Sequence, residues 1–161
     1  MWKLSSLNVI DISRAAIITA ALLAWIYLVS HISVTLTPSL SHRVFYIDKG
    51  FSKAGKGDYV LFDFSSELIE GGRPVKGLKQ IGCDEGDYLQ EMMGDYFCDM
   101  EYLGRAKERS LKGEPLSKFT YRGAVPPGKI FVVGDSVDSF DSRYWGFLDK
   151  GEIIAKAYPI F

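Results

Sequence analysis

Two kinds of side chain in this sequence have the chemistry for nucleophilic catalysis: serine hydroxyls at Ser39 and Ser41, and basic groups able to take up a hydroxyl proton. A serine hydroxyl is a poor nucleophile until a neighbouring base removes its proton, and histidine is the usual base. The sequence contains two histidines, His31 and His42. His31 lies at the edge of a long apolar run, and an extended chain would point His42 to the face opposite Ser39. The pattern therefore disfavours a serine-histidine pair.

Lysine is the alternative base, provided that burial removes the charge from its amine near neutral pH. Lys79 meets this demand best, because it lies within the apolar segment Val75–Ile81 and directly follows Leu78. Lys76 stands three residues earlier and would face the other side of a strand. Burial lowers a lysine pKa by up to several units, at a cost of about 1.4 kcal/mol per unit. Taken alone, the local sequence favours an ordinary solvated lysine at this position.

Cys83 and Cys98 are the two cysteines of the sequence, too few for a disulfide scaffold or for a zinc site built from thiolates. In an oxidising compartment they could form one disulfide, which would close a loop of about 15 residues and contribute about 3 kcal/mol. Two unrelated, reduced cysteines are the other interpretation. The sequence leaves both open.

Four blocks, in the same order, resemble the motifs of the serine-lysine signal peptidases, and the resemblance covers most of the chain after the apolar run. Ser139–Gly146 matches the family signature Ser-x-Asp-Ser-Arg-Tyr-Trp-Gly at every position. The other three blocks are Thr37–Leu40, Leu78–Asp87 and Val125–Asp135. Within the family, the chain is most similar to the TraF-type signal peptidases of conjugative transfer systems. It shares with them the sequence Ser-Phe-Asp-Ser-Arg-Tyr, a short domain and the sequence Ser-Leu-x-x-x-Val-Phe-Tyr.

The resemblance implies the roles of the reacting groups. Ser39 would be the nucleophile and Lys79 the general base. The backbone N–H of Ser39 and the hydroxyl of Thr37 would form the oxyanion hole. Lys79 would take the hydroxyl proton while the oxyanion hole stabilises the charge that develops on the attacked carbonyl oxygen.

The resemblance also implies a supporting set. Ser139 would hydrogen-bond and orient the lysine amine, and Asp141 and Arg143 would form an ion pair beside it. The chain departs from the TraF-like pattern at Ser41, where that pattern carries proline. Ser41 is therefore a rival nucleophile, although Ser39 is the serine that matches the nucleophile motif.

The activity that the family resemblance implies is hydrolysis of a peptide bond in an exported precursor, such as a conjugative pilin. Water would release the acyl-enzyme, or the precursor's own amine would do so and give a cyclic product; the sequence leaves both open. No metal or organic cofactor is expected, and a charge balance of 19 basic against 20 acidic residues argues against a nucleic-acid partner. The alternatives are a general leader peptidase for secretory proteins and a non-catalytic, membrane-tethered scaffold of a secretion or pilus apparatus.

Residues 15–34 form an uncharged, largely apolar run of 20 residues, long enough for a helix that crosses a lipid bilayer. Lys3 and Arg14 precede the run together with a single acid, which favours a cytoplasmic segment 1–14 under the positive-inside rule. Residues 35–161 would then form a periplasmic domain anchored in the inner membrane. A cleavable signal peptide is the competing interpretation, but the run is longer than the roughly 7 to 15 residues of an h-region.

Short apolar segments separated by glycine and proline follow this run, and such punctuation is typical of strands. The sequence predicts a mainly β, antiparallel domain, which the resemblance places in the signal peptidase type. Gly94-Asp95 is predicted as the turn of a hairpin between strands 88–93 and 96–102. The polar segment 105–116 is predicted as a short helix or a surface excursion. The other predicted strands are 44–47, 59–64, 75–81, 129–133 and 153–160.

Overall fold

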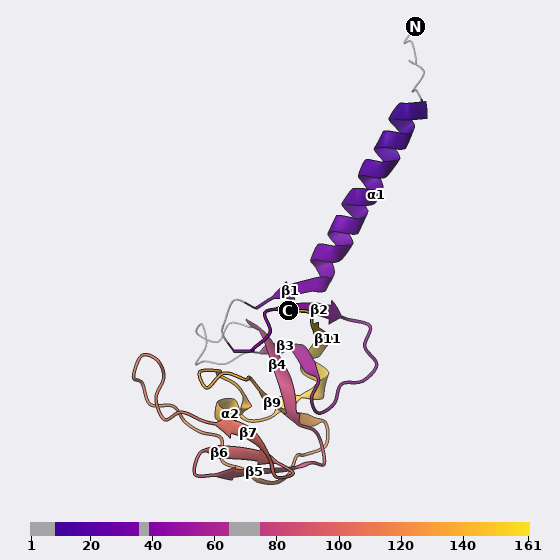
Figure 1. Ribbon diagram of the computed structural model, residues 1–161. Coiled ribbons are helices and arrows are strands. Elements are labelled where there is room, and N and C mark those ends of the chain that lie inside the picture. Colours follow the sequence, from indigo (N-terminus) through magenta and orange to yellow (C-terminus); the bar gives the residue numbers. More distant parts are fainter. Residues whose placement is uncertain (1–8, 36–38, 65–74) are drawn as a thin grey trace. The chain divides into compact units, whose positions relative to one another are not determined.

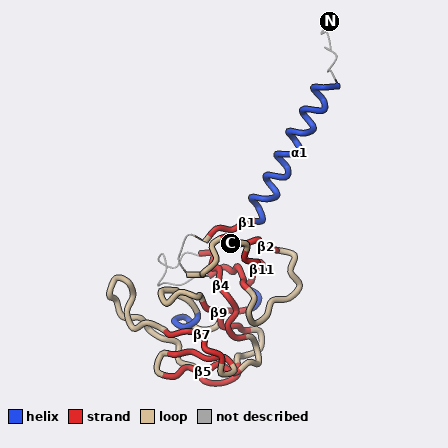
Figure 2. Tube along the Cα trace, viewed as in Figure 1, coloured by secondary structure: helices blue, strands red, loops and turns tan. Residues whose placement is uncertain are grey.

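The computed structural model describes residues 9–35, 39–64 and 75–161, and the chain forms two compact units, residues 1–32 and 33–161. The first unit contains the helix α1, Val9–His31. The second is built from strands, turns and loops, with short helical elements between the last strands (Figures 1 and 2). The predicted fold class, mainly antiparallel β with one apolar N-terminal helix, is confirmed.

Helix α1 has the length and composition of a membrane span. Asp11–His31 covers 21 residues with a mean hydropathy of 1.9. That is enough to cross a hydrocarbon core of about 30 Å. The predicted run, 15–34, extends past the end of the helix, because Ile32–Val34 form the short strand β1. β-branched residues favour extended chain and are also strongly apolar, so hydropathy alone places them within the span.

A seven-stranded sheet carries the segments on which the site is built. Its strand order is β1-β2-β11-β3-β4-β9-β10, and every neighbouring pair from β2 to β10 is antiparallel. The C-terminal strand β11 lies between β2 and β3, so the last strand of the chain is inserted beside the first strands of this unit (Figure 1). The strands are β2 Val44–Asp48, β3 Tyr59–Phe64, β4 Val75–Cys83, β9 Lys129–Val133, β10 Leu148–Asp149 and β11 Ile153–Pro159.

A four-stranded sheet, in the order β7-β6-β5-β8, lies at the end of this unit away from β2 and β11 (Figure 1). The predicted hairpin is present, but its turn is Met93-Gly94 rather than Gly94-Asp95, because Met92 pairs with Asp95. Both turn residues have positive φ, 53° and 90°, as the common two-residue hairpin turn requires. The strands are β5 Tyr88–Met92, β6 Asp95–Cys98, β7 Glu101–Arg105 and β8 Arg122–Ala124.

Two predicted segments differ from the structure in detail. The predicted strand 96–102 is interrupted at Asp99 and Met100, whose φ angles of 48° and 70° reverse the chain between β6 and β7. The polar segment 105–116 forms no helix; after the end of β7 it is a loop with one isolated bridge. A surface excursion, the second of the two expected alternatives, is therefore what the chain forms there.

Among the described residues of this unit, the buried side chains form three core groups. The largest group packs the four-stranded sheet against β9 and is rich in aromatic residues, and the other two lie along the seven-stranded sheet. The short helix α2, Ser142–Trp145, follows β9, and a 3-10 turn, Lys150–Glu152, precedes β11. Fully buried members of the three groups include Tyr96, Phe131, Phe62, Ile130 and Phe45.

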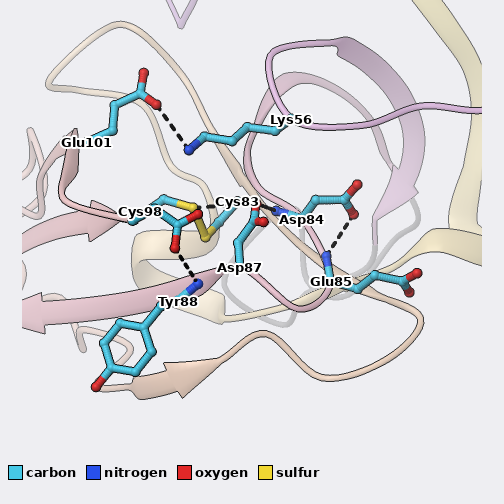
Figure 3. The surroundings of a disulfide bond; sticks show 9 residues. Lys56, Cys83, Asp84, Glu85, Asp87, Tyr88, Cys98 and Glu101 are labelled. Atoms are coloured by element: carbon cyan, nitrogen blue, oxygen red, sulfur yellow. Dashed lines mark hydrogen bonds and ion pairs between the residues drawn. A yellow bond between two sulfur atoms is a disulfide. The ribbon is translucent and has the colours of Figure 1, made fainter.

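A disulfide between Cys83 and Cys98 joins the two sheets. Cys83 is the last residue of β4 and Cys98 the last of β6, and both are completely buried. Beside it an ion pair of 3.1 Å links Lys56, before β3, to Glu101 of β7 (Figure 3). The two sulfur atoms and the Asp87 carboxylate lie within 4.8 Å of one another, but sulfurs that are bonded to each other offer no thiolate to a metal ion. The disulfide therefore acts as a link between β4 and the smaller sheet.

Candidate active site

Ser39 and Lys79 line the same groove. The groove has a volume of about 430 Å³, and its lining combines residues 33–35, parts of β3, and the first half of β4. Phe140 and Trp145 contribute aromatic side chains to it. Apart from the serine and lysine, the lining is mostly apolar, which is typical of a site that holds a ligand by burial and orients it with few polar groups. Ser41 is not part of this lining.

Lys79 is almost completely buried, with 7% of its surface exposed. Its Nζ donates a hydrogen bond of 2.7 Å to Oγ of Ser139, which is also buried. Burial lowers the pKa of Lys79 to about 8; the charge of Asp141 opposes this shift, Arg143 adds to it, and Asp135 opposes it more weakly. At pH 7 about a tenth of such an amine is uncharged, compared with less than a thousandth for a solvated lysine. The amine is therefore suited to act as a general base near neutral pH.

The alternation of β4 explains why this lysine is buried. Lys79 and Ile81 point to the buried face of the strand, whereas Lys76 is exposed and forms an ion pair of 3.1 Å with Asp63 on β3. The prediction that the two lysines face opposite sides of a strand is confirmed. Val60 of β3 is paired with Lys79 and is completely buried, so the lysine stem lies on an apolar face of the sheet, and this burial disfavours the charged amine.

Gly134 brings the nucleophile candidate and the lysine partner together. A Cβ at this position would lie 2.3 Å from Oγ of Ser139 and 2.5 Å from the carbonyl oxygen of Ser39. Those two oxygens are therefore no farther apart than the sum of these distances. The backbone N–H of Ser136 also donates to the Ser39 carbonyl, at 3.2 Å. The absence of a side chain at residue 134 allows the turn containing Ser39 to pack directly on the loop that follows β9.

Asp141 and Arg143 form a completely buried, two-pronged ion pair. Arg143 donates from Nε to Oδ1 of Asp141 at 2.8 Å and from Nη2 to Oδ2 at 2.7 Å, and the residues are 2% and 0% exposed. Burial works against the arginine charge, but the hydrogen bonds and charge of Asp141 outweigh it and raise the pKa of Arg143. Asp141 Oδ2 also accepts the N–H of Gly134 at 2.9 Å, and Arg143 donates to the Ser136 carbonyl at 3.3 Å. The pair therefore fixes the loop that touches both Ser39 and Lys79.

The remaining site candidates are distributed as follows. Thr37, expected in the oxyanion hole, lies outside the described residues. The hydroxyl of Ser41 donates to Asp135 at 2.5 Å, away from the groove of Lys79. The roles of Gly134 and Asp135 were not predicted individually, and the Gly-Asp pair directly after the apolar strand β9 is the sequence signal that could have indicated them.

The comparison with known proteins agrees with this geometry. The family described as "Signal peptidase, peptidase S26" matches residues 6–161. The chain belongs to this family. The signal peptidase resemblance deduced from four sequence blocks is thereby confirmed at the level of the family.

Three curated relatives of this signal peptidase family member are similar over shorter stretches. Signal peptidase I of Buchnera aphidicola is 39% identical over 79 residues, which are 47% of this chain and 24% of that protein. Signal peptidase I of Bacillus caldolyticus is 39% identical over 64 residues, 36% of this chain and 35% of that protein. Signal peptidase I of Aquifex aeolicus is 46% identical over 44 residues, 27% of this chain and 17% of that protein. The chain therefore spans at most about a third of the length of these relatives.

Proposed function

We propose that this protein is a membrane-anchored serine endopeptidase that cleaves exported precursors, with Ser39 as nucleophile and Lys79 as general base. One observation carries the proposal: a buried lysine amine, hydrogen-bonded to Ser139, shares a groove with a serine. Maintaining a lysine in such a place costs stability, and a purely structural role gains nothing from an amine that is poised to lose its charge.

The proposed reaction begins when neutral Lys79 takes the hydroxyl proton of Ser39, whose oxygen attacks the scissile carbonyl carbon. The backbone N–H of Ser39, with Thr37, would stabilise the negative charge on the carbonyl oxygen. The ammonium of Lys79 then gives its proton to the leaving amine, and an ester of Ser39 remains. The lysine, neutral again, removes a proton from the water that releases the acyl group. Ser139 keeps the amine aimed during both steps through its 2.7 Å hydrogen bond.

An extended peptide suits the groove better than a compact ligand. The groove is bordered by β1 and the following residue and by the first half of β4. That half pairs with β3 along one edge, and β4 pairs with β9 from Gln80 onward, so the other edge of Val75–Lys79 could pair with an incoming segment. Small side chains before the scissile bond would fit an apolar lining of this size, as the family resemblance implies. We therefore expect the substrate to bind in extended form with its scissile carbonyl at Ser39.

Membrane anchoring gives the enzyme access to its substrates. Helix α1 is proposed as the anchor, with residues 1–14 on the cytoplasmic side and residues 35–161 outside the inner membrane. Because Ser39 follows the helix by a few residues, it would work near the lipid headgroups, where a precursor's cleavage point leaves its own apolar segment. Proximity in the membrane then replaces high affinity for the substrate.

The finer assignment concerns the kind of precursor. The TraF-like wording of the Ser139–Gly146 block favours a dedicated conjugative pilin precursor, released by water or by cyclisation, over the general secretory precursors of a leader peptidase. The mass of the product distinguishes the two releases, because cyclisation yields a product lighter by one water than the hydrolysed chain. Cleavage of unrelated secretory precursors at equal rates would support the general leader peptidase instead.

The central experiment compares Ser39→Ala, Ser41→Ala and Lys79→Ala in the full chain, with a pilin precursor and a serine-acylating reagent. We expect the first and third variants to leave the precursor uncut and to take up no acyl group, while the second still cuts. The acylation rate of the wild type should rise with pH as Lys79 loses its proton, with a midpoint near its pKa of about 8. Cutting by Ser39→Ala at the normal rate would refute the assignment, and a wild type that takes up no acyl group would favour the scaffold.

A further inference from the structure

The contact between Ser41 and Asp135 has no part in the mechanism proposed above. Ser41 stands where the TraF-like pattern carries proline, and its hydroxyl donates to Oδ2 of Asp135 at 2.5 Å. The backbone N–H of Ser41 donates to the same oxygen at 2.8 Å. A proline could donate neither bond, because it has no backbone N–H and no hydroxyl. This double hydrogen bond therefore depends on the residue at which the chain departs from the pattern.

These two hydrogen bonds lie next to a third contact between the turn of Ser39 and the loop after β9. The N–H of Ser136 donates to the carbonyl of Ser39 at 3.2 Å. Residues 39 and 41 are thus held by the consecutive residues Asp135 and Ser136 of the loop after β9. The same loop contains Ser139, which accepts the hydrogen bond of the Lys79 amine. One loop therefore holds the nucleophile from one side and the general base from the other.

We propose that Ser41 and Asp135 are positioning residues, whose two hydrogen bonds hold the turn of Ser39 in the orientation that proton transfer to Lys79 requires. This inference rests on the proposed function. Hydrogen bonds to a carboxylate are stronger than those between neutral groups, and both converge on one oxygen. A nucleophile displaced by about 1 Å can lose about 100-fold in rate, so a small shift of this turn is sufficient to affect catalysis. In this arrangement Ser41 supports the nucleophile and does not compete with it.

Asp135 has a second effect that separates it from Ser41. Its charge acts on the Lys79 amine, together with the charges of Asp141 and Arg143, and it favours the protonated amine. Asp135→Asn should therefore both loosen the turn and shift the rise of activity to lower pH. Ser41→Ala keeps the carboxylate and should leave the midpoint of the pH profile unchanged. A purely structural defect would lower the yield of folded protein without moving this midpoint.

The test measures kcat and KM of the full chain on a synthetic precursor peptide with an Ala-x-Ala leader end. Both side chains are exposed, so the loss of one hydrogen bond is expected to have an effect at or below the lower end of the range for charged hydrogen bonds. We expect kcat to fall about fivefold in Ser41→Ala and about tenfold or more in Asp135→Asn, with KM nearly unchanged. Ser41→Thr retains the hydroxyl and should restore kcat to within about twofold of the wild type. Asp138→Asn is the matched control, because it makes the same change in the same loop at a carboxylate that pairs with Lys107 and not with the turn of Ser39; it should change kcat much less than Asp135→Asn does.

Amide hydrogen exchange of residues 39–45 provides a readout that does not depend on catalysis. Faster exchange of this segment in Ser41→Ala and Asp135→Asn, together with the lower kcat, would establish the positioning role. Unchanged exchange, or unchanged kcat in variants whose segment exchanges faster, would overturn it while leaving the proposed function intact. A wild type that cleaves no precursor and takes up no acyl group at Ser39 would overturn the proposed function, and this inference with it.

Discussion

Replacing Lys79 by methionine should abolish activity and, at neutral pH, stabilise the protein. Methionine preserves most of the apolar stem of the lysine and removes the amine that burial penalises. The pKa of Lys79 is lowered from 10.5 to about 8. Below pH 8 the amine is protonated in both the folded and the unfolded chain, so the folded chain bears the full cost of burying the charge. Because the unfolded chain binds more protons between pH 8 and 10.5, wild-type stability rises with pH across that window.

The size of the effect follows from the same shift. At pH 7 the cost to the wild type is about 3 kcal/mol, at pH 9 about 2 kcal/mol, and at pH 10 less than about 1 kcal/mol. Against this, methionine removes the hydrogen bond to the buried Ser139 hydroxyl, a loss of about 1 to 2 kcal/mol. Lys79→Met should therefore be more stable than the wild type by about 1 to 2 kcal/mol at pH 7. At pH 10 it should be the less stable of the two.

Urea unfolding of the full chain in detergent, followed by tryptophan fluorescence at several pH values from 7 to 10, measures this difference. Lys76→Met is the matched control, because Lys76 lies on the same strand but is exposed and forms an ion pair with Asp63. Its stability difference from the wild type should stay within about 0.5 kcal/mol at every pH. A difference in the free energy of unfolding between Lys79→Met and the wild type that stays constant from pH 7 to 10 would show that Lys79 has an ordinary pKa. Lys79 would then not be a desolvated base.

Two further predictions concern the scaffold around the site. Gly134→Ala should lower the acylation rate of Ser39 by at least about tenfold. The added Cβ would lie 2.5 Å from the Ser39 carbonyl oxygen, and a backbone atom cannot move aside cheaply. An unaltered rate would contradict this close packing. Replacing Cys83 and Cys98 together by serine should lower the free energy of unfolding by about 3 kcal/mol or more, since the disulfide closes a loop across 15 residues and both positions are buried. Equal urea midpoints for the wild type and the variant would show that the stability of the two sheets does not depend on this disulfide.

Most strands of the fold could be predicted because each has a local signal. Short apolar runs bounded by glycine and proline placed β3 and β9 correctly, and the three-residue offset between Lys76 and Lys79 correctly assigned them to opposite faces. Errors arose where a single dihedral angle or a pairing decided the outcome. Neither the turn at Met93-Gly94 nor the break at Asp99 is visible from composition, since non-glycine residues adopt positive φ there. The predicted span 15–34 includes the strand β1 after the end of α1, because residues that favour strands are also apolar.

For the candidate site, too, local sequence predicted some features, and contacts between distant segments decided the others. Its residue types and their order along the chain could be read from the sequence, because motif spacing and strand periodicity are properties of neighbouring residues. Whether those residues meet depended on contacts between distant segments. Lys79 and Ser139 are 60 residues apart, and Ser41 and Asp135 are 94 residues apart. Such contacts bury the lysine amine, bring the two cysteines together in a disulfide, and pack the turn of Ser39 against Gly134. The sequence by itself determined which groups were available for chemistry, and only tertiary packing, by excluding water and fixing distances, decided which of them could react together.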